Sequence, residues 1–274
     1  MNAVKASVII STYNQPQWLE KVLWGYQVQT FKDFEIVIAD DGSNAETKVL
    51  IDSFKKNSPL EIKHVWQPDQ GFQKTKILNK AIVASAYDYL IFTDGDCIPR
   101  NDFVSEHIRL RRRNYFLSGG YFKLPKPLSE AITRQDIEHQ DCFKLRWLQT
   151  HGLEKNFKAN KLTAFGFKAW FLNTFTPTKA TFDGMNVSGW KKDILEVNGF
   201  DERMQYGGED REIGERLMNK GIAFRQVRYS TICLHLYHER PYLNTLALEK
   251  NKLIRKQTRR SKTVMTPYGI TKLT

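Results

Sequence analysis

The sequence predicts an α/β fold in which helices flank a mixed, mainly parallel sheet within one large domain. The first hundred residues alternate short apolar runs with segments of helical periodicity, as in βαβ units. Some of these runs end in turns rich in Asp and Gly, where open sheets bind ligands. With 274 residues, of which 41% are hydrophobic, the chain can bury a sizeable core.

The first part of the chain predicts four strands separated by helices. The strands are the apolar, mostly β-branched runs Ala6–Ser11, Phe34–Ala39, Glu61–Trp66 and Tyr89–Thr93. Apolar residues recur at helical spacing over Trp18–Tyr26 and Ile77–Ile82, and a further helix is predicted around Ala45–Lys56. Asn14 and Pro16 stand at the predicted N-cap and first turn of the first helix.

The regular alternation stops after Gly119-Gly120. Leu124–Pro127 is predicted as a turn or linker, and Leu128–Leu153 as helical. A second strand–helix block begins at Thr181. Its predicted elements are a helix from about Glu209 to Gly221, a strand over Ile222–Tyr229 and a basic terminal helix over Leu243–Lys262.

Residues Lys155–Ala180 form an aromatic-rich and basic segment. Its aromatic residues are Phe165, Phe167, Trp170, Phe171 and Phe175. We expect a helix packed on the core. The alternative is a flap that binds an acceptor or faces a membrane.

The formal net charge of +12 indicates an anionic partner, such as nucleic acid, a phosphorylated ligand or an anionic membrane surface. One basic cluster is Arg109, Arg111, Arg112 and Arg113. A second lies near the C-terminus and consists of Lys250, Lys252, Arg255, Lys256, Arg259, Arg260 and Lys262. Either cluster alone could be a solvated helix face. We expect the C-terminal cluster to contact anionic headgroups and to lie apart from any active site.

The sequence predicts a cytoplasmic protein, peripheral at the inner face of the membrane. There is no apolar run of 18 residues and no signal-peptide pattern at the N-terminus. Cys97, Cys142 and Cys233 are widely spaced and odd in number, which fits neither a disulfide framework nor a zinc pattern.

Asp94-Gly95-Asp96 directly follows the predicted strand Tyr89–Thr93 and is the most informative motif. Two carboxylates held by a glycine turn can share a divalent cation and a nucleotide-bound group. Acid-Gly-acid turns are also common in solvated loops, so this motif gains its meaning from its neighbours.

Four patterns occur in order along the chain, namely Val8–Asn14, Ile38–Ser43, Thr93–Asp96 and Tyr206–Asp210. Together they resemble the inverting family-2 glycosyltransferases of the GT-A fold, a Rossmann-like fold. The later part resembles the C-terminal region of β-1,4-galactosyltransferases and chondroitin-polymerase-type domains. The resemblance covers the chain from about Ala6 to Pro241.

The resemblance implies how a nucleotide-sugar donor is held. Thr12 and Tyr13 match the segment whose aromatic residue packs on uracil, and Asp41 matches the acid that accepts a bond from the uracil N–H. Gln73 and Lys76 lie at the start of the third predicted helix, where backbone N–H groups suit an anion. Asp94 matches the first acid of the family's DXD motif, which faces the ribose or donor sugar.

By the same resemblance, Asp96 is a direct ligand of Mn²⁺ or Mg²⁺. The segment Leu234–Pro241 is similar to a Tyr-His-x-x-Pro-like segment whose histidine completes the metal site. His238 fits that register better than His235, which stays as the alternative. The cation would neutralise charge on the leaving diphosphate.

Tyr206–Asp210 resembles the family's Trp-Gly-Gly-Glu-Asp, with Tyr206 in place of the usual Trp. The resemblance implies that Asp210 is the catalytic base and that Glu209 hydrogen-bonds hydroxyl groups. A single base opposite the leaving group implies inversion of configuration. Gly184–Ser188 is also similar to a family segment beside the sugar pocket.

On this resemblance, residues 1–120 form the donor-binding half of one GT-A domain. Residues 121–241 form the acceptor and catalytic half with a helical insertion on the acceptor side, and residues 242–274 form a basic C-terminal tail or helix. The implied function is transfer of a sugar, as by a hexosyltransferase, from a nucleotide donor, UDP being favoured. The acceptor would be a glycan or a lipid-linked glycan in surface polysaccharide or lipopolysaccharide synthesis.

Two other classes of protein stay open at this point. The net charge of +12 suggests a nucleic-acid-binding protein, although none of its motifs is recognised and no nucleic acid is expected as a partner. A catalytically inactive GT-A scaffold is the other alternative. Against the inactive scaffold stand the intact Asp94, Asp96, Asp210 and His238.

Overall fold

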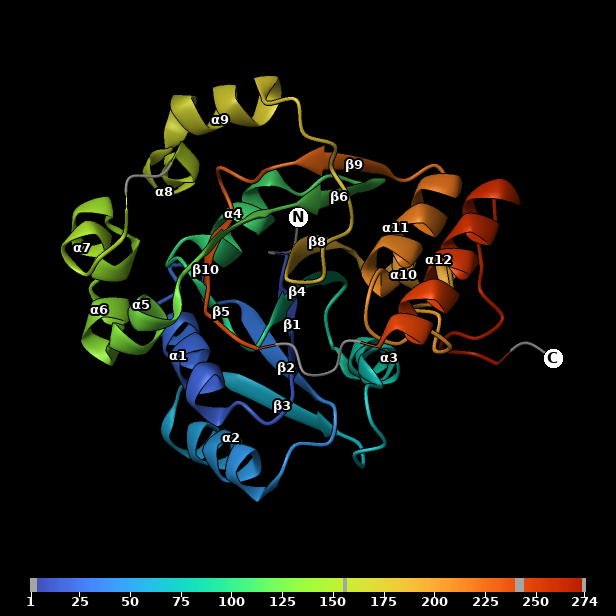
Figure 1. Cartoon of the computed structure of the whole chain (residues 1–274), viewed down its shortest axis with the longest axis horizontal. Helices are drawn as coiled ribbons and strands as arrows, with labels where there is room; N and C mark the ends of the chain where they lie inside the picture. The colour runs from blue at the N-terminus through green and yellow to red at the C-terminus, as the bar shows by residue number, and fades with distance from the viewer. Residues whose placement is uncertain (1–3, 155–156, 240–243, 273–274) are drawn as a thin grey trace.

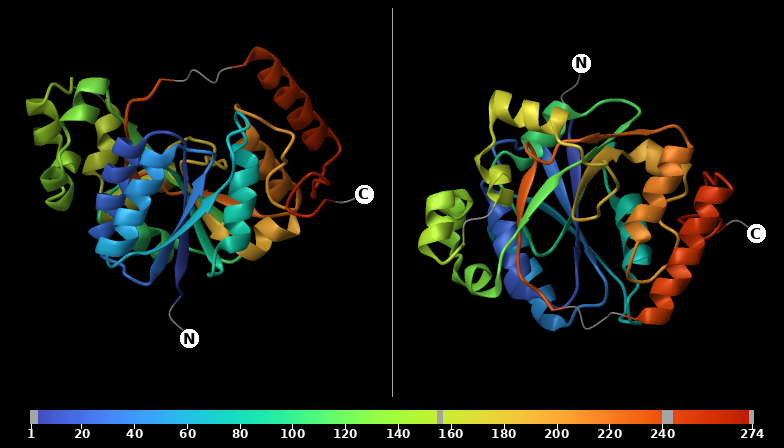
Figure 2. Two further views of the ribbon diagram at one scale, coloured as in Figure 1. Left: turned by 90° about the horizontal axis from the view of Figure 1, so that it is seen from below. Right: turned by 45° about the horizontal axis from the view of Figure 1, so that its top comes forward.

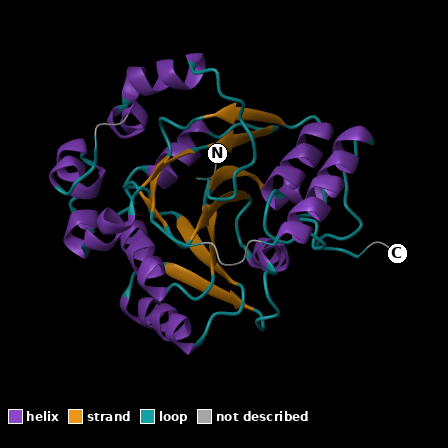
Figure 3. Ribbon diagram, viewed as in Figure 1, coloured by secondary structure: helices purple, strands orange, loops and turns teal. Residues whose placement is uncertain are grey.

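The computed structural model describes residues 4–154, 157–239 and 244–272, and a seven-stranded sheet lies at its centre (Figures 1 and 3). The strand order is β3-β2-β1-β4-β8-β6-β9. The strands are β1 (Ala6–Thr12), β2 (Phe34–Asp40), β3 (Glu61–Trp66), β4 (Tyr89–Asp94), β6 (Tyr115–Ser118), β8 (Asn186–Trp190) and β9 (Ala223–Gln226). Only β8 runs antiparallel to its neighbours in this sheet, which confirms the predicted mixed, mainly parallel sheet.

Helices cover both faces of this sheet. Those on one face are α1 (Pro16–Gln27), α2 (Ala45–Asn57) and α4 (Phe103–Leu110), and those on the other are α3 (Lys74–Ala84), α10 (Lys191–Glu196) and α11 (Glu209–Asn219). Alternate residues of β1 enter the two cores, with Val8 and Ile10 in one and Ile9 in the other. Because both faces are buried, the strands appear in the sequence as continuous apolar runs.

A second sheet, with strand order β5-β10-β7, extends from the loop after β4. Its strands are β5 (Cys97–Pro99), β7 (Gly120–Lys123) and β10 (Ile232–His235). β10 pairs antiparallel with β5, so that His235 lies opposite Cys97. The backbone N–H of Leu236 donates to the carbonyl of Asp96 at 2.9 Å. The residues after β10 therefore return to the Asp94–Asp96 loop, as the family resemblance implied for the histidine segment.

The region predicted as helical over Leu128–Leu153 consists of several short helices. They are α5 (Lys126–Ala131), α6 (Arg134–Glu138), the 3-10 helix η1 (Asp141–Phe143) and α7 (Leu145–Thr150). Thr133 begins a new helix because it forms a capping box with Asp136. Gln140 then adopts a left-handed conformation with φ of 58°, which interrupts the chain again.

Three smaller predictions are corrected. Gln15, and not Asn14, is the N-cap of α1, because Asn14 has φ of 47° and Pro16 occupies the first turn. The predicted linker over Leu124–Pro127 already contains the start of α5. The predicted strand over Ile222–Tyr229 is shorter and forms β9. Lys155, Pro241 and Leu243, where predicted segments begin or end, lie outside the described residues.

The aromatic-rich segment packs on the core only through its first part, where Ala159 and Leu162 are buried, so the favoured prediction is wrong for its later part. It forms η2 (Phe157–Ala159), α8 (Asn160–Thr163) and α9 (Gly166–Phe175), and α9 lies at the periphery of the molecule (Figure 1). Phe167 is 76% exposed and Phe175 62% exposed, and Ala169 is the buried residue of this helix. The alternative prediction of a flap is the one that fits this arrangement.

The basic C-terminal segment forms α12 (Thr245–Arg260), which lies beside α11 (Figure 2). Arg255 and Arg259 form ion pairs with Glu215 of α11 at 2.7 and 2.8 Å. The prediction that this segment lies apart from the active site is therefore wrong, because α12 packs on the helix that begins with Glu209 and Asp210. Among the described residues, no helix combines the length and apolar character needed to cross a bilayer.

Candidate active site

The loops that follow β1, β2 and β4 meet at one edge of the central sheet. Ser11 of β1 lies in register with Asp94 of β4, and Thr12 with Asp40 of β2. The backbone N–H of Asp41 donates to the carbonyl of Thr12 at 3.1 Å, and that of Gly95 donates to Ser11 at 2.7 Å. Three of the four predicted motifs are thus adjacent in space, at the edge where open α/β sheets bind ligands.

Tyr13 and Asp41, the two residues predicted to hold the nucleobase of the donor, have different environments. Tyr13 is 47% exposed, and its hydroxyl donates to Asp69 at 2.8 Å, so a ring face is open to a ligand. Asp41 is buried, and its carboxylate accepts hydrogen bonds from the backbone N–H of Gln73 at 2.8 Å and from Gln67 at 2.7 Å. Burial raises the pKa of Asp41 despite these bonds. Asp41 thus fixes the start of α3.

Lys74, which the sequence analysis overlooked, is the lysine that lies at the centre of this site. Its Nζ is 2.6 Å from Oδ1 of Asp94, which also accepts a hydrogen bond from the hydroxyl of Ser11. Burial alone would lower the pKa of Lys74, but the carboxylates of Asp94, Glu209 and Asp210 raise it above its usual value. The side chain of Lys76 makes no hydrogen bond or ion pair with the described part of the chain.

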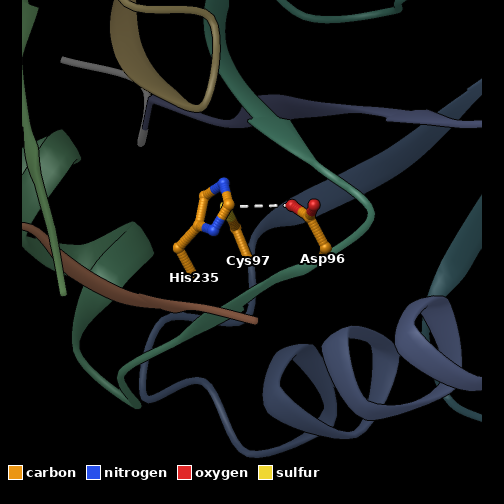
Figure 4. Close-up of side chains that lie close together, drawn as sticks. All are labelled: Asp96, Cys97 and His235. Carbon is orange, nitrogen blue, oxygen red and sulfur yellow. Dashed lines mark hydrogen bonds between the residues drawn. The ribbon is translucent and has the colours of Figure 1, made fainter. Parts of the chain in front are cut away.

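Asp96 lies beside both histidines of the segment that follows β10. Nε2 of His238 is 3.5 Å from Oδ2 of Asp96, and the rings of His235 and His238 are 5.2 Å apart. Figure 4 shows His235 and Cys97 next to Asp96, and one potential ligand atom from each of these three lies within 4.8 Å of the others. The Cys97 thiol donates to Asp96 at 3.4 Å.

This donor set fits a hard divalent cation. Carboxylate oxygen and imidazole nitrogen suit Mn²⁺, whereas a thiol is too soft for Mn²⁺ or Mg²⁺. A separation of 3.5 Å between the Asp96 and His238 atoms is also close to the spacing of two ligands on one ion, about 3 Å for metal–ligand distances near 2.1 Å. The structure brings both histidines to Asp96, so His238 stays the predicted ligand and His235, whose ring also packs against Tyr121 at 5.9 Å, stays the alternative.

Helix α11 begins with Glu209 and Asp210, of which Asp210 is the predicted catalytic base. Gly207 and Gly208 precede them with φ of 107° and 91°, values that favour glycine. Oε2 of Glu209 accepts the backbone N–H of Gly207 at 2.8 Å. The carboxylate of Asp210 accepts the backbone N–H groups of Arg211 at 2.7 Å and Gly184 at 3.3 Å. The two acids therefore have different partners, as consecutive helix residues pointing about 100° apart should.

Asp183 is a further acid of this site that the sequence analysis did not identify. Burial, followed by repulsion from Asp210, raises the pKa of Asp183 to about 6. Burial and Asp210 likewise raise the pKa of Glu209 to about 7. Nη2 of Arg211 lies 3.8 Å from Asp183. The sequence offered one indication that Asp183 belongs to the site. Asp183 directly precedes the Gly184–Ser188 segment, which is similar to a family segment beside the sugar pocket.

Helix α12 holds the loop that leads to Glu209. The side chain of Asn251 is 1% exposed, and its Nδ2 donates to the carbonyls of Gln205 at 2.9 Å, Tyr206 at 3.3 Å and Gly207 at 3.1 Å. A Cβ on Gly207 would lie 2.2 Å from Cδ2 of Leu248. The ring of Tyr206 meets that of Phe72 edge-on, with centroids 5.7 Å apart.

Comparison with known proteins identifies the class of protein that this fold and site define. The family model "Glycosyl transferase family 2" matches residues 7–171, and the model "N-terminal domain of galactosyltransferase" matches residues 173–239. The first match covers more than half of the chain. The chain therefore belongs to glycosyl transferase family 2.

Two curated relatives are similar over most of this chain. Chondroitin synthase of Escherichia coli is 28% identical over 248 residues, which are 86% of this chain and 34% of that protein. Validoxylamine A glucosyltransferase of Streptomyces hygroscopicus subsp. jinggangensis is 27% identical over 275 residues, covering 91% of this chain and 60% of that protein. The chain thus spans about a third of the first relative and three fifths of the second.

Solved structures show the same GT-A glycosyltransferase fold. The mannosyltransferase PcManGT from Pyrobaculum calidifontis, solved with GDP-Man and Mn²⁺, has a TM-score of 0.57 at 17% identity and covers 96% of this chain and 64% of that one. S. aureus TarS 1-349 in complex with UDP-GlcNAc has a TM-score of 0.60 at 14% identity and covers 94% of this chain and 69% of that one. The predicted fold class and enzyme class are confirmed.

Glu209 should make stability depend on pH. Its pKa is about 7 in the folded state, whereas an unfolded glutamate titrates near the ordinary value of 4.5. Between these values the folded state holds a proton that the unfolded state has released, so stability falls as pH rises, by about 1.4 kcal/mol per unit of pKa difference. Urea unfolding of the wild type and Glu209→Gln between about pH 5 and pH 8 should show the wild type losing stability relative to the variant.

The exposed Glu61 provides the control for this measurement. Glu61→Gln should give a stability difference from wild type that is nearly constant over the same pH range. A Glu209→Gln difference as flat as that of Glu61→Gln would contradict the assigned environment of Glu209.

Asn251 should be needed for transfer but not for nucleotide binding. Asn251→Leu keeps the side-chain volume but removes the donor shared by three carbonyls of the loop before Glu209. Displacement of catalytic groups by about 1 Å can cost on the order of 10²-fold in rate, and we expect a loss of that order in sugar transfer. The exposed Gln257 on the same helix is the matched control. If Asn251→Leu transfers sugar as fast as Gln257→Leu, α12 has no role in positioning the acids.

Proposed function

We propose that this protein is a metal-dependent inverting glycosyltransferase that moves a sugar from a UDP donor to a glycan or lipid-linked acceptor in surface polysaccharide or lipopolysaccharide synthesis. The observation that carries the proposal is the meeting of Asp96 with His238 at 3.5 Å, next to the Lys74–Asp94 ion pair. A cation site and a buried ammonium side by side suit the diphosphate of a nucleotide-sugar.

The donor side of the proposal rests on the first three loops. The half-exposed ring of Tyr13 offers a surface on which a base can stack, and Thr12 lies next to it at the end of β1. Asp41 can accept one more hydrogen bond, because each carboxylate oxygen has two lone pairs and each already holds one partner. Among the solved neighbours, TarS 1-349 is in complex with UDP-GlcNAc, which supports the choice of UDP.

The cation, Mn²⁺ or Mg²⁺, would be held by Asp96 and His238. When bound, it would supply a positive charge that stabilises the leaving diphosphate. Lys74 lies beside Asp94 on the same side of the site and would bind the diphosphate directly as a point charge. The solved complex of PcManGT with GDP-Man and Mn²⁺ supports a divalent cation in this fold.

The acceptor side of the proposal rests on the start of α11. Asp210 would take the proton of the acceptor hydroxyl while that oxygen attacks the anomeric carbon and the bond to the diphosphate breaks. One displacement of this kind inverts the configuration at that carbon. Glu209, whose pKa is about 7, can donate or accept a hydrogen bond near neutral pH and would recognise a sugar hydroxyl. Asp183 would stabilise the acceptor beside Asp210.

Metal binding can be tested with UDP as the ligand. Asp96→Ala should abolish Mn²⁺-dependent UDP binding measured by calorimetry, because the carboxylate is the charged ligand. His238→Ala should weaken this binding. The exposed His151→Ala is the control and should leave binding unchanged. Binding that survives both Asp96→Ala and His238→Ala would refute the assignment, and a loss with His235→Ala but not with His238→Ala would assign the ligand to His235.

The base can be tested with Asp210→Asn, which keeps the size of the side chain but removes its basicity. Transfer, measured as UDP release in the presence of acceptor, should fall by about 10²–10⁴-fold. UDP and Mn²⁺ binding should change little, and the exposed Asp52→Asn should change neither quantity. A transfer rate near that of wild type would sink the assignment, as would a loss of UDP affinity equal to that of Asp96→Ala.

A nucleic-acid-binding function is less well supported by the structure. Arg255 and Arg259 of the C-terminal cluster share Glu215 as an ion-pair partner, and Arg109 is paired with Glu106. Salt-dependent binding to bulk DNA, together with no binding of any UDP-sugar, would favour the nucleic-acid alternative over the proposed transferase.

A further inference from the structure

Helix α9 presents a continuous row of aromatic side chains to solvent. Phe167, Trp170, Phe171 and Phe175 follow helical spacing, and each is at least 46% exposed. The centroids of neighbouring rings lie 5.4 Å apart for Phe167 and Trp170, 6.5 Å for Phe167 and Phe171, and 4.7 Å for Phe171 and Phe175. Contiguous exposed apolar surface of this kind marks an interaction site. We call these four residues the aromatic row.

The opposite side of α9 attaches the helix to the body of the protein. The side chain of Asn173 donates to the hydroxyl of Ser230 at 2.9 Å and accepts the backbone N–H of Tyr229 at 2.9 Å. Ala169 packs against Tyr229 in a small buried cluster. Because residues two positions apart on a helix point about 200° from each other, Ala169 and Asn173 face away from Phe167 and Phe171. The aromatic row is therefore not needed to hold α9 in place.

The charge around α9 indicates what the aromatic row contacts. Residues 155–182 contain five lysines and neither Asp nor Glu, and Lys168 and Lys179 are exposed. The cavity of about 330 Å³ beneath α9 is lined by the ion pairs Arg100–Asp102 and Arg109–Glu106 and by Arg225, which forms no ion pair within the described ranges and leaves the lining with an excess positive charge. A second copy of this chain would bring the same positive charge against itself and be repelled. An anionic bilayer would attract the lysines and accept the aromatic rings at its interface.

From this arrangement we infer that α9 docks on an anionic lipid bilayer through the aromatic row, with Lys168 and Lys179 at the headgroups. The helix then lies in the plane of the interface. Eight residues lead from Phe175 to Asp183, so Phe175 stays within about 29 Å of Asp183, and the next residue, Gly184, donates to Asp210 at the start of α11. This contact would bring the acceptor side of the site close to the bilayer. Binding requires no sugar, so it can be tested independently of the proposed transfer reaction.

Co-sedimentation of the full chain with vesicles tests the inference. The wild type should bind vesicles of phosphatidylcholine with roughly 30% phosphatidylglycerol, and should bind pure phosphatidylcholine at least about fivefold more weakly. The double variant Phe167→Ser with Phe171→Ser should lose about tenfold or more of its affinity for the anionic vesicles. The matched control, Val49→Ser with Leu253→Ser, removes two equally exposed apolar residues elsewhere and should change affinity by less than about twofold.

A charge-reversal pair separates α9 from the basic helix α12. Lys168→Glu with Lys179→Glu should weaken anionic-vesicle binding by about tenfold or more, whereas Lys252→Glu with Lys256→Glu on α12 should have a smaller effect. The reverse order would overturn the inference and assign the contact to α12. Equal binding of anionic vesicles by the Phe167→Ser/Phe171→Ser variant and by the wild type would also overturn the inference. So would a dimer, detected by sedimentation velocity, that the Phe167→Ser/Phe171→Ser variant dissolves while vesicle binding is absent.

Each variant should still bind UDP with Mn²⁺ as the wild type does, because the substituted side chains lie outside the candidate active site. A variant that loses both activities has lost its fold, and Trp170→Phe then provides a milder test. Trp170 should contribute a blue shift of fluorescence when wild-type protein binds anionic vesicles, and that part of the shift should be missing in Trp170→Phe. Identical shifts in the two proteins would count against docking through α9.

Discussion

A single buried ammonium group, that of Lys74, makes the acid-rich centre of this protein possible. Its ion pair with Asp94 joins the end of β4 to the start of α3, and its field reaches Glu209 and Asp210 at the start of α11. Burial, and after it repulsion between neighbouring carboxylates, makes such acids hold their protons more tightly, as the raised pKa values of Glu209 and Asp183 show. The position of Lys74 is fixed in turn by Asp41, which holds the backbone of Gln73 at the N-cap of α3. The donor loops and the catalytic helix are thus coupled through one side chain.

Two later parts of the chain complete the site around that centre. The pairing of β10 with β5 returns the histidine segment to Asp96, because His235 lies opposite Cys97 in the antiparallel register. Helix α12 reaches the site from the other side, where Asn251 satisfies three consecutive carbonyls before Glu209. These partly buried carbonyls would lose hydrogen bonds without this donor, so the side chain of Asn251 favours the observed arrangement of the loop with two left-handed glycines. Both parts are far in sequence from the residues that they position.

The sequence could predict the central sheet and the loops at its edge because the signals for both are local. The strands β1, β2 and β4 are mostly apolar runs buried on both faces, and Asp41 and Asp94 lie where two of these runs end. The strands β5, β7 and β10 are only three or four residues long, and a run that short has no measurable period. Their existence depends on pairing between distant segments, so the position of His235 beside Asp96 could not be derived from spacing.

The choice between Lys74 and Lys76 illustrates a second limit of sequence-based prediction. Residues two positions apart on a helix point about 200° from each other, so an error in the helix start changes which lysine faces the site. The aromatic helix shows a third limit. Periodicity indicates that one side of residues 166–175 is apolar, but it does not tell whether that side meets the protein core or another phase. Only the attachment through Asn173 and Ala169 distinguishes these two possibilities.

The distribution of charge explains how one chain can be strongly basic and still form an acidic centre. The residues that give the net charge of +12 are mostly exposed. Glu209 is buried and Asp183 and Asp94 are half-buried, and these three acids lie around Lys74. Exposed charges act on an approaching anion only over a Debye length, about 8 Å at physiological salt, and therefore influence encounter more than retention. A nucleotide-sugar diphosphate would repel the inner carboxylates unless a cation accompanied it. Under the proposed function, the carboxylates that would favour a cation-bound donor are the same groups that the charge of Lys74 balances in the described structure.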